Sequence, residues 1–232
     1  MIYFGCVGMS SERPKQILYE QFAEVAKGVA HGHRLEILEL LAQGELSVEV
    51  LAERAGLSIA NASQHLRLMR RAGLLASRRV GKHILYGLSD PAVLDLVVSL
   101  RRVGERNVAA VRDVIGGYFH RRDAFEPVSR KELARRLKDG LVTVLDVRPR
   151  DEFGAGHLPN AINIPLRELP KRLRDIPKTR EVVAYCRGPY CVLAFEAVAL
   201  LRERGFKVRR LEDGYPEWKA AGLPVEASPA ST

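Results

Sequence analysis

The first half of the chain has the hydrophobic spacing of amphipathic helices. Apolar residues recur three and four positions apart over 16–30, and a denser apolar run over 33–41 predicts a second, more buried helix. Gly44 ends this run, and Ser47 is a suitable N-cap for a third helix that continues to Ala55. The pattern therefore predicts a mainly helical beginning.

A fourth helix follows the third after a very short break. Gly56 interrupts the chain, Ser58 can cap the new helix, and Gly73 stops it after Ala72. Two short helices joined by a tight, glycine-containing turn are typical of a helix-turn-helix.

A small hairpin and a long helix complete this half. Two β-prone runs at 77–80 and 84–88 surround Gly81, which predicts a hairpin or wing. Pro91 then stands near the start of an apolar-striped helix that continues to Ile115. A stripe of this length needs a partner surface.

The pattern changes after residue 120. Apolar strands at Val142–Val147 and Val182–Tyr185 now alternate with helical stretches such as Val192–Arg204, as in an α/β unit. We therefore expect the following organisation: an N-terminal tail (1–13), a mainly α winged helix-turn-helix domain (14–120), a charged linker (121–127), an α/β domain (128–226) and a C-terminal tail (227–232).

Composition narrows the class of protein. The chain has 232 residues, 47% hydrophobic and 28% charged, which excludes collagen-like, low-complexity and mostly disordered proteins. No apolar run approaches the roughly 18 residues of a membrane span, and none resembles a signal peptide. Three cysteines, Cys6, Cys186 and Cys191, are too few for a disulfide scaffold. We expect a cytoplasmic protein without a membrane partner.

Positive charge is concentrated in one segment. The net charge is +9, and the segment from Ser58 to Gly87 holds no acidic residue. Such a local surplus suits a polyanionic partner. The segment contains six basic residues: Arg67, Arg70, Arg71, Arg78, Arg79 and Lys82.

This segment resembles the winged helix-turn-helix of ArsR-type bacterial repressors. The resemblance rests on Ser63-Gln64-His65-Leu66, Ala72-Gly73-Leu74, the Gly81-Lys82 wing and Tyr86, and extends over about residues 16–118. It implies a homodimer that pairs through its first and last helices and binds double-stranded, palindromic operator DNA.

A helix in the major groove presents short polar side chains to base edges, whereas basic side chains reach phosphates. The expected base contacts are Asn61, Ser63, Gln64 and His65, and the expected phosphate contacts are Arg67, Arg70, Arg79 and Lys82. The alternative is that these residues are solvated surface residues of a helical protein-interaction domain and do not contact DNA.

Metal sensing of the kind found in many ArsR repressors is not expected. Residues 47–55 contain no cysteine or histidine, and residues 88–115 contain no histidine. The ligand types for zinc or soft metals are therefore missing at the two sites that the family uses. We expect no metal, and any sensing chemistry must lie elsewhere.

The second half contains a cysteine in a setting that favours reactivity. Cys186 follows directly on a strand, and the helix that begins at Val192 points its N-terminus back toward it. Amide donors and the helix dipole stabilise a thiolate and can lower a thiol pKa from about 8.5 to roughly 3.5–7.5. Arg187 adds positive charge beside the thiol.

These residues resemble the rhodanese family from about Val128 to Val225. The matching motifs are Leu145-Asp146-Val147-Arg148, Gly156-His157-Leu158-Pro159, the strand into Cys186, and Leu211-Glu212-Asp213-Gly214-Tyr215-Pro216-Glu217-Trp218. The resemblance implies a parallel sheet flanked by helices, a covalent persulfide on Cys186, and no separate cofactor. It also implies a loop that cradles the persulfide or an oxyanion, formed by Arg187, Gly188, Pro189, Tyr190, Cys191 and Val192.

Other residues of the motifs are expected to support the site. Asp146 and Arg148 hold the architecture or the loop entrance, and His157 belongs to a structural turn. The loop departs from the commonest rhodanese pattern because Cys191 stands at its fifth place after Cys186. Cys191 is either a thiol that attacks a persulfide or a small buried residue, and both remain open. A phosphatase or arsenate reductase is a minor alternative.

Two main functions are compatible with this combination. The first is a dimeric transcriptional regulator, in the role of a repressor, whose operator affinity responds to sulfane sulfur at Cys186. The second is an active sulfurtransferase, fed by a sulfur donor and a thiol acceptor, with an attached DNA-binding domain. A constitutive DNA-binding protein whose second domain binds an anion without chemistry is the third.

Overall fold

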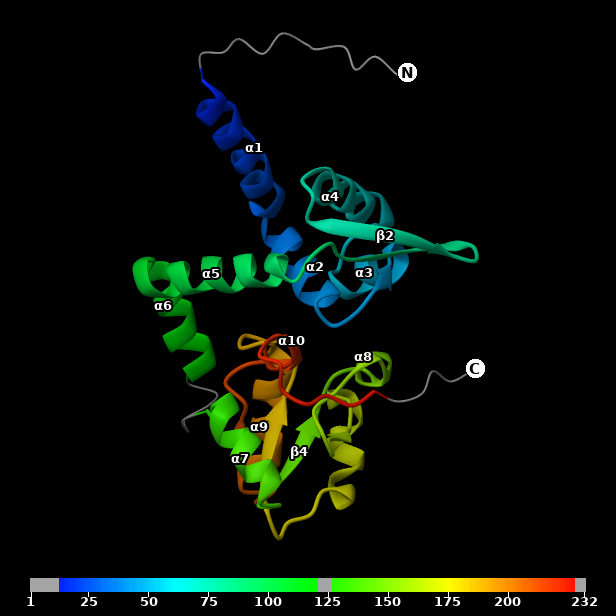
Figure 1. Ribbon diagram of the computed structural model, residues 1–232. Helices are drawn as coiled ribbons and strands as arrows, with labels where there is room; N and C mark the ends of the chain where they lie inside the picture. Colours follow the sequence, from blue (N-terminus) through cyan, green and yellow to red (C-terminus); the bar gives the residue numbers. More distant parts are fainter. Residues whose placement is uncertain (1–12, 121–126, 228–232) are drawn as a thin grey trace.

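The computed structural model describes residues 13–120 and 127–227, which form two bodies (Figure 1). Cys6 and most of the expected tails (1–13 and 227–232) and linker (121–127) lie outside the described residues. Within the described ranges, no helix is long and apolar enough to cross a membrane.

Four helices form the core of the first body. They are α1 (Pro14–Val29), α2 (Gly32–Leu41), α3 (Val48–Arg54) and α4 (Ile59–Arg71). The Ser58 hydroxyl accepts the backbone N–H of Asn61 at 3.2 Å and so caps α4. The helix-turn-helix of α3 and α4 predicted from the sequence is confirmed.

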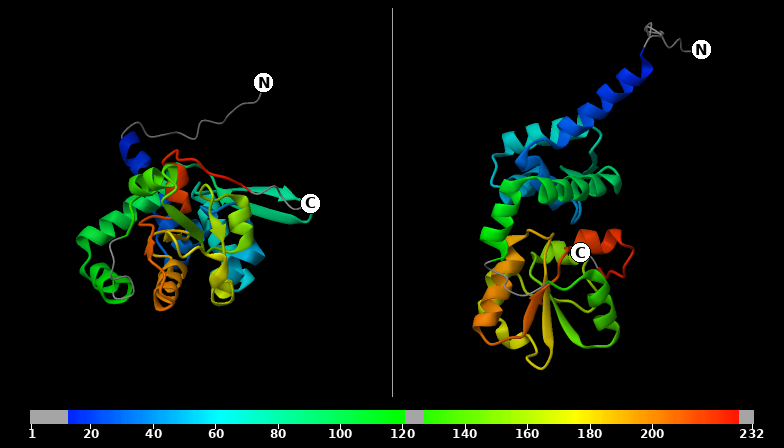
Figure 2. Two further views of the ribbon diagram at one scale, coloured as in Figure 1. Left: turned by 90° about the horizontal axis from the view of Figure 1, so that it is seen from below. Right: turned by 90° about the vertical axis from the view of Figure 1, so that its left-hand side faces the viewer.

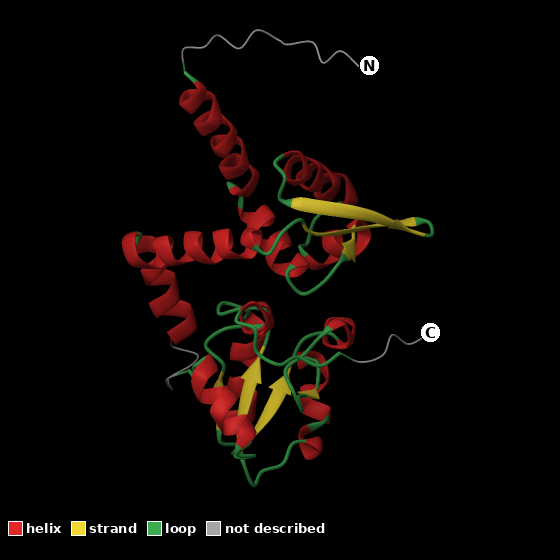
Figure 3. Ribbon diagram, in the orientation of Figure 1, coloured by secondary structure: helices red, strands yellow, loops and turns green. Residues whose placement is uncertain are grey.

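The predicted wing is also confirmed. Strands β1 (Leu46–Ser47), β2 (Leu75–Val80) and β3 (His83–Leu88) pair antiparallel in the order β1-β3-β2 (Figure 3). The tip between β2 and β3 turns at Gly81, whose φ of 58° is in the left-handed region that favours glycine.

The long helix predicted up to Ile115 is interrupted. It consists of α5 (Ala92–Asn107), α6 (Ala109–Val114) and a π-helical turn over Ile115–His120. Val108 has an extended conformation, with φ −105° and ψ 113°, and the Asn107 side chain donates to the carbonyl of Val103 at 3.0 Å. The prediction of one continuous helix was wrong, because the extended backbone at Val108 ends α5 and turns the chain toward the second body (Figures 1 and 2).

The second body has a parallel four-stranded sheet in the order β5-β4-β6-β7, with helices on both faces (Figure 2). Its carboxyl edge points toward the first body, as the arrowheads in Figure 1 show. The elements are α7 (Arg130–Lys138), β4 (Val142–Asp146), α8 (Arg150–Ala155), β5 (Ile162–Asn163), 3-10 turns (Leu166–Lys171 and Leu173–Asp175), β6 (Glu181–Tyr185), α9 (Val192–Glu203), β7 (Val208–Arg210) and α10 (Tyr215–Ala220).

Apolar side chains fill both faces of this sheet. Val198 and Leu201 of α9 pack on one face, and Leu133 of α7 and Trp218 of α10 pack on the other. The Trp218 indole donates to the carbonyl of Pro224 at 2.8 Å, so its buried N–H has a partner. The predicted α/β architecture is confirmed, and it places the ends of β4 and β6 beside the first body.

Candidate functional site

The two cysteines of the second body meet at the carboxyl end of β6. Cys186 follows β6, Cys191 is the N-cap residue of α9, and their sulfurs form a disulfide across a Cα separation of 6.2 Å. Cys186 is 1% exposed and Cys191 is 8% exposed. We call residues 186–191 the sulfur loop. Both thiols belong to one buried loop in front of a helix N-terminus, where positive dipole charge favours anions.

Backbone contacts hold the sulfur loop in place. The N–H of Cys191 donates to the carbonyl of Gly188 at 3.2 Å, and the N–H of Tyr215 donates to the carbonyl of Cys186 at 3.1 Å. Gly214 lies so close that a Cβ there would be 2.3 Å from the carbonyl carbon of Arg187. The expected role of the amides of residues 187–192 as a cradle for sulfur stays a prediction.

Asp146 and Arg148, at the end of β4, form a fully buried ion pair. Arg148 Nη2 lies 2.7 Å from Asp146 Oδ2 and 2.7 Å from the carbonyl oxygen of Gly156. Burial opposes the charge of the guanidinium, but Asp146 outweighs it and raises the pKa of Arg148. The guanidinium also lies over the Tyr215 ring, 4.5 Å from its centroid. This geometry fits the supporting role expected for the pair.

His157 takes part in the turn that its motif predicts. It is buried, its ring stacks on Phe153, and its Nδ1 lies 2.9 Å from the carbonyl oxygen of Phe153. Its backbone pairs with Glu226 in an isolated bridge.

A glutamine of the first body links it to the sulfur loop. Gln43, directly after α2, is 5% exposed, and its Nε2 donates to the carbonyl of Arg187 at 3.2 Å. Its Oε1 accepts from Nη1 of Arg148 at 2.9 Å. One side-chain amide therefore joins α2 to the residue after Cys186 and to the buried ion pair on β4.

An arginine of α3 makes a second link. The buried carboxylate of Glu152 accepts from Nη1 of Arg54 at 2.6 Å and from Nη2 of Arg187 at 2.7 Å. Arg54 also pairs with Asp151. The helix that precedes α4 is thus connected to the sulfur loop through a shared carboxylate.

Helix α5 makes the third link. The Tyr190 hydroxyl donates to Glu105 Oε1 at 2.7 Å, and Arg101 Nη1 donates to Glu217 Oε1 at 3.1 Å. Burial, and then the bond to Glu105, raise the pKa of Tyr190, so its hydroxyl remains a donor at neutral pH.

Sequence reasoning missed the residues of the first body that make these links. They lie on α3, on α5 and just after α2, and their partners are about a hundred residues further along the chain, so no local motif marks them. They are Gln43, Arg54, Arg101 and Glu105.

Glu39 lies in the same junction. Burial, and to a smaller extent Glu217 and Glu36, raise the pKa of its carboxyl, while Arg101 and Arg187 act in the opposite direction. A Cβ built on Gly188 would be 2.9 Å from Oε1 of Glu39, which shows how closely α2 approaches the loop.

A groove of about 530 Å³ runs along the junction beside the loop. Both bodies contribute to it: Val50 and Arg54 come from α3, and Pro165, Arg167 and Arg187 come from the second body. Three arginines therefore line a space next to the residue that follows Cys186, although two of them are paired with acids.

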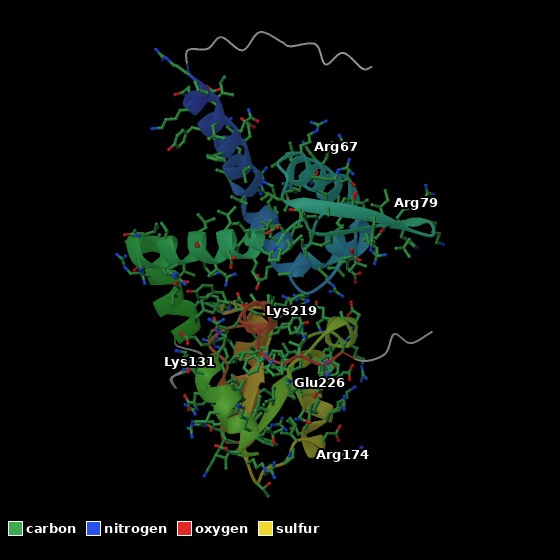
Figure 4. All side chains as sticks on the ribbon, in the orientation of Figure 1. Arg67, Arg79, Lys131, Arg174, Lys219 and Glu226 are labelled. Atoms are coloured by element: carbon green, nitrogen blue, oxygen red, sulfur yellow. A yellow bond between two sulfur atoms is a disulfide. The ribbon has the colours of Figure 1, made fainter. Side chains whose placement is uncertain are left out.

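Most of the predicted DNA-contacting residues are exposed on α4 and the wing. Asn61, Gln64 and Arg67 are exposed on α4, as are Arg79 and Lys82 on the wing. Figure 4 shows Arg67 and Arg79 on the first body, away from the second. The contacts of these residues with DNA stay a prediction.

Three of the predicted residues have contacts within the protein. Arg70 donates to the Ser77 hydroxyl at 3.3 Å, Arg79 donates to the carbonyl of Gly81 at 3.1 Å, and Ser63 is half-buried. Such bonds orient the side chains without burying their charge.

His65 lies at the edge of this surface, against the start of α2. Its ring centroid is 4.7 Å from that of His31 and 6.1 Å from that of His33. Burial, followed by the charges of His31, Arg34 and His33, lowers the pKa of His65. In the described ranges, no group of three or more histidine, cysteine or acidic side chains has the geometry of a metal site.

Comparison with known proteins adds three findings. A helix-turn-helix domain model matches residues 29–78, and a rhodanese-like domain model matches residues 129–221. The chain is 44% identical over 216 residues to the HTH-type transcriptional regulator Rv0324 of Mycobacterium tuberculosis, covering 91% of this chain and 93% of that protein. It is 34% identical over 102 residues to a sulfurtransferase of Allochromatium vinosum, covering 43% of this chain and 94% of that protein.

Among solved structures, the chain is similar to the homodimeric winged helix-turn-helix DNA-binding domain Mb0332 of Mycobacterium bovis, a possible ArsR-family regulator. The identity is 35%, with 44% of this chain and 94% of that chain covered and a TM-score of 0.40. From the domain matches and the near full-length regulator, the chain belongs to the HTH-type transcriptional regulators, and it carries a C-terminal rhodanese-like domain.

Proposed function

We propose that this regulator is a dimeric repressor whose affinity for operator DNA responds to sulfane sulfur at Cys186. One observation carries the proposal: the loop that holds Cys186 and Cys191 is bonded directly to helices of the DNA-binding domain. Chemistry at the thiols can therefore alter the position of α2, α3 and α5.

The DNA contacts come from α4 and the wing. A segment without acidic residues that presents an exposed helix of major-groove size beside a basic hairpin suits double-stranded DNA. In this arrangement Asn61 and Gln64 contact base edges, and Arg67, Arg79 and Lys82 contact phosphates.

Two apolar faces support a homodimer. Helix α1 projects from its domain (Figure 1), and α5 carries a second apolar stripe. A second copy of the chain would cover both faces. The exposed apolar residues are Ile17, Leu18, Tyr19 and Phe22 on α1, and Leu96, Leu100 and Val103 on α5.

The sulfur step needs a persulfide donor and the two thiols. The Cys186 thiolate attacks the terminal sulfur of a hydropersulfide donor R–S–SH, which forms the hydropersulfide Cys186–S–SH and releases the thiolate RS⁻. The Cys191 thiolate then attacks Sγ of Cys186, which forms the disulfide and releases HS⁻. The sulfane sulfur is reduced to sulfide while the two thiols are oxidised, and a cellular dithiol restores them.

Operator binding tests the proposal. Fluorescent DNA from upstream of the gene is titrated, at fixed salt, with reduced protein and with protein treated with glutathione persulfide, its sulfur content checked by intact mass. We expect a reductant-reversible change of about 5 to 150-fold in affinity, the range of typical two-site coupling, and none in Cys186→Ser. Tight binding of operator DNA with the same affinity in both sulfur states contradicts the proposal.

A sulfurtransferase is the second candidate, supported by the similarity of the rhodanese-like domain to the Allochromatium protein. An enzyme moves sulfur from donor to thiol acceptor many times, whereas a sensor is modified once. Cys191→Ser separates the two functions, because it should spare turnover at Cys186 and abolish a disulfide-based change in DNA affinity. Multiple turnovers together with sulfur-independent DNA binding would favour the enzyme.

A further inference from the structure

The loop that carries the thiol of the proposed chemistry lies against the DNA-binding domain. Cys186 is 1% exposed, and the loop beyond it lies against α2. At Gly188 the approach is so close that an added Cβ would come within 2.9 Å of Glu39 Oε1. A donor molecule that must reach Cys186 therefore meets the other domain at this side of the loop.

Gln43 is the central contact of this cover. Both ends of its buried amide are used across the junction, since Nε2 donates to the carbonyl of Arg187 and Oε1 accepts from Arg148. Truncation of this side chain leaves a buried carbonyl and a buried guanidinium N–H without this partner. A glutamine at this position thus favours the closed arrangement.

Polar contacts at flanking points also join the two domains. Arg54 shares the carboxylate of Glu152 with Arg187, and Glu105 holds the hydroxyl of Tyr190. Polar junctions between domains resemble transient interfaces, which open more easily than hydrophobic cores. The contacts can therefore separate without unfolding of either domain.

We infer that Gln43 is a positioning residue that holds the DNA-binding domain over the sulfur loop, so that small electrophiles and sulfur donors reach Cys186 only when α2 and α3 withdraw. This inference rests on the proposed function only in that Cys186 is the thiol that reacts. It assigns to α2 a second role besides packing in the helix-turn-helix core.

Alkylation of Cys186 in the full-length, fully reduced protein tests the inference. Iodoacetamide is added in excess, and the tryptic peptides that carry Cys186 and Cys191, which are separated by cleavage after Arg187, are followed by mass spectrometry. We expect Cys186 of Gln43→Ala to react at least about tenfold faster than in the wild type, because loss of the buried contacts favours the open state. The matched control Gln21→Ala, an exposed amide on α1, should react like the wild type.

The pH dependence separates a cover from an effect on the thiol itself. Opening of the junction raises the alkylation rate by the same factor at every pH and leaves the midpoint of the pH profile unchanged. Equal rates in Gln43→Ala and the wild type overturn the inference. A displaced midpoint with an unchanged plateau rate also overturns it, because Gln43 would then act on the charge of the thiol.

Folding of the first domain, which carries Gln43, is checked by its helical circular dichroism, and folding of the second by the fluorescence of its buried Trp218, the single tryptophan of the chain. If Gln43→Ala loses the native signal, Arg54→Ala takes its place and should accelerate alkylation in the same direction. The assay uses neither DNA nor persulfide. An alkylation result that contradicts the inference would therefore not contradict the proposed sulfur response of DNA binding. Likewise, DNA binding that does not respond to sulfur would not contradict the role of Gln43.

Discussion

The two functional surfaces of this regulator differ in how their polar groups are satisfied. On α4 and the wing, Asn61, Gln64 and Lys82 are exposed to solvent. In the sulfur loop, Cys186 is buried, and its neighbour Arg187 is bonded through both backbone and side chain.

The difference shows what each surface requires in order to act. Exposed cations are available to a polyanion without rearrangement, and their binding is sensitive to salt. Under the proposed function the buried thiol must first be uncovered, so its chemistry would depend on movement between the domains. The molecule combines an exposed polar surface with a buried sulfur loop, and the following substitutions test that contrast.

The largest effect is expected for Arg148→Ala. It removes the guanidinium from a fully buried pair and leaves Asp146 charged and uncompensated, which costs about 3–5 kcal/mol in comparable cases. Urea unfolding followed by Trp218 fluorescence measures the loss. Arg174→Ala, whose side chain is 91% exposed, is the control. A difference below about 1 kcal/mol, the value of an exposed pair, would contradict the buried role of Arg148.

Two substitutions on the open surface should differ from each other. Gln64→Ala is expected to weaken operator binding by about 1–3 kcal/mol and to lower specificity, whereas Lys82→Ala should weaken all DNA and reduce the salt slope by about 1. Titrations of operator and random DNA at several salt concentrations measure both quantities. Equal losses on both DNAs for both variants would argue against α4 as the base-contacting helix.

Loss of a helix cap gives a smaller effect. Ser58→Ala removes the hydroxyl that accepts the N–H of Asn61, which should destabilise the DNA-binding domain by about 1 kcal/mol. Thermal unfolding monitored by circular dichroism detects the change. Ser77→Ala on β2, which removes no cap, serves for comparison. An unchanged melting temperature in Ser58→Ala would count against a stabilising cap.

The smallest effect is expected at Glu39, and it depends on pH. Burial raises the pKa of this carboxyl, so its charged form costs stability. Below the ordinary pKa of glutamate the group is neutral in both folded and unfolded states, so the penalty is absent. It grows as pH rises from the ordinary pKa to the raised pKa and stays constant above that. Glu39→Gln should therefore raise the melting temperature at pH 8 and have less effect near pH 4.5. An increase in melting temperature that is independent of pH would contradict this explanation.

Much of each surface was predictable from local patterns. Ser58 and Gly73 delimit α4 because capping and left-handed conformations belong to particular residue types. A strand that ends directly at Cys186, followed by a helix at Val192, places the thiol before a helix N-terminus. These features depend on residues that are adjacent in sequence, so short sequence motifs are enough to predict them.

Other features were not predictable in this way. The break at Val108 competes with a helical stripe that continues on both sides of it, so periodicity alone favours one helix. Whether Cys191 bonds to Cys186 or is only buried was left open, since the path of a short loop decides it. No sequence motif predicts the contacts of Gln43 and Arg54, because their partners belong to another domain.

The sequence by itself determined the two kinds of domain, the helix-turn-helix with its wing, and the cysteine at the end of a central strand. Hydrophobic period, capping residues and short motifs are local properties, and they suffice for these features. The tertiary structure alone decided that α2, α3 and α5 cover the sulfur loop. Contacts such as Gln43 to Arg187 join residues far apart in the chain, and only the packing of the two folded domains brings them together.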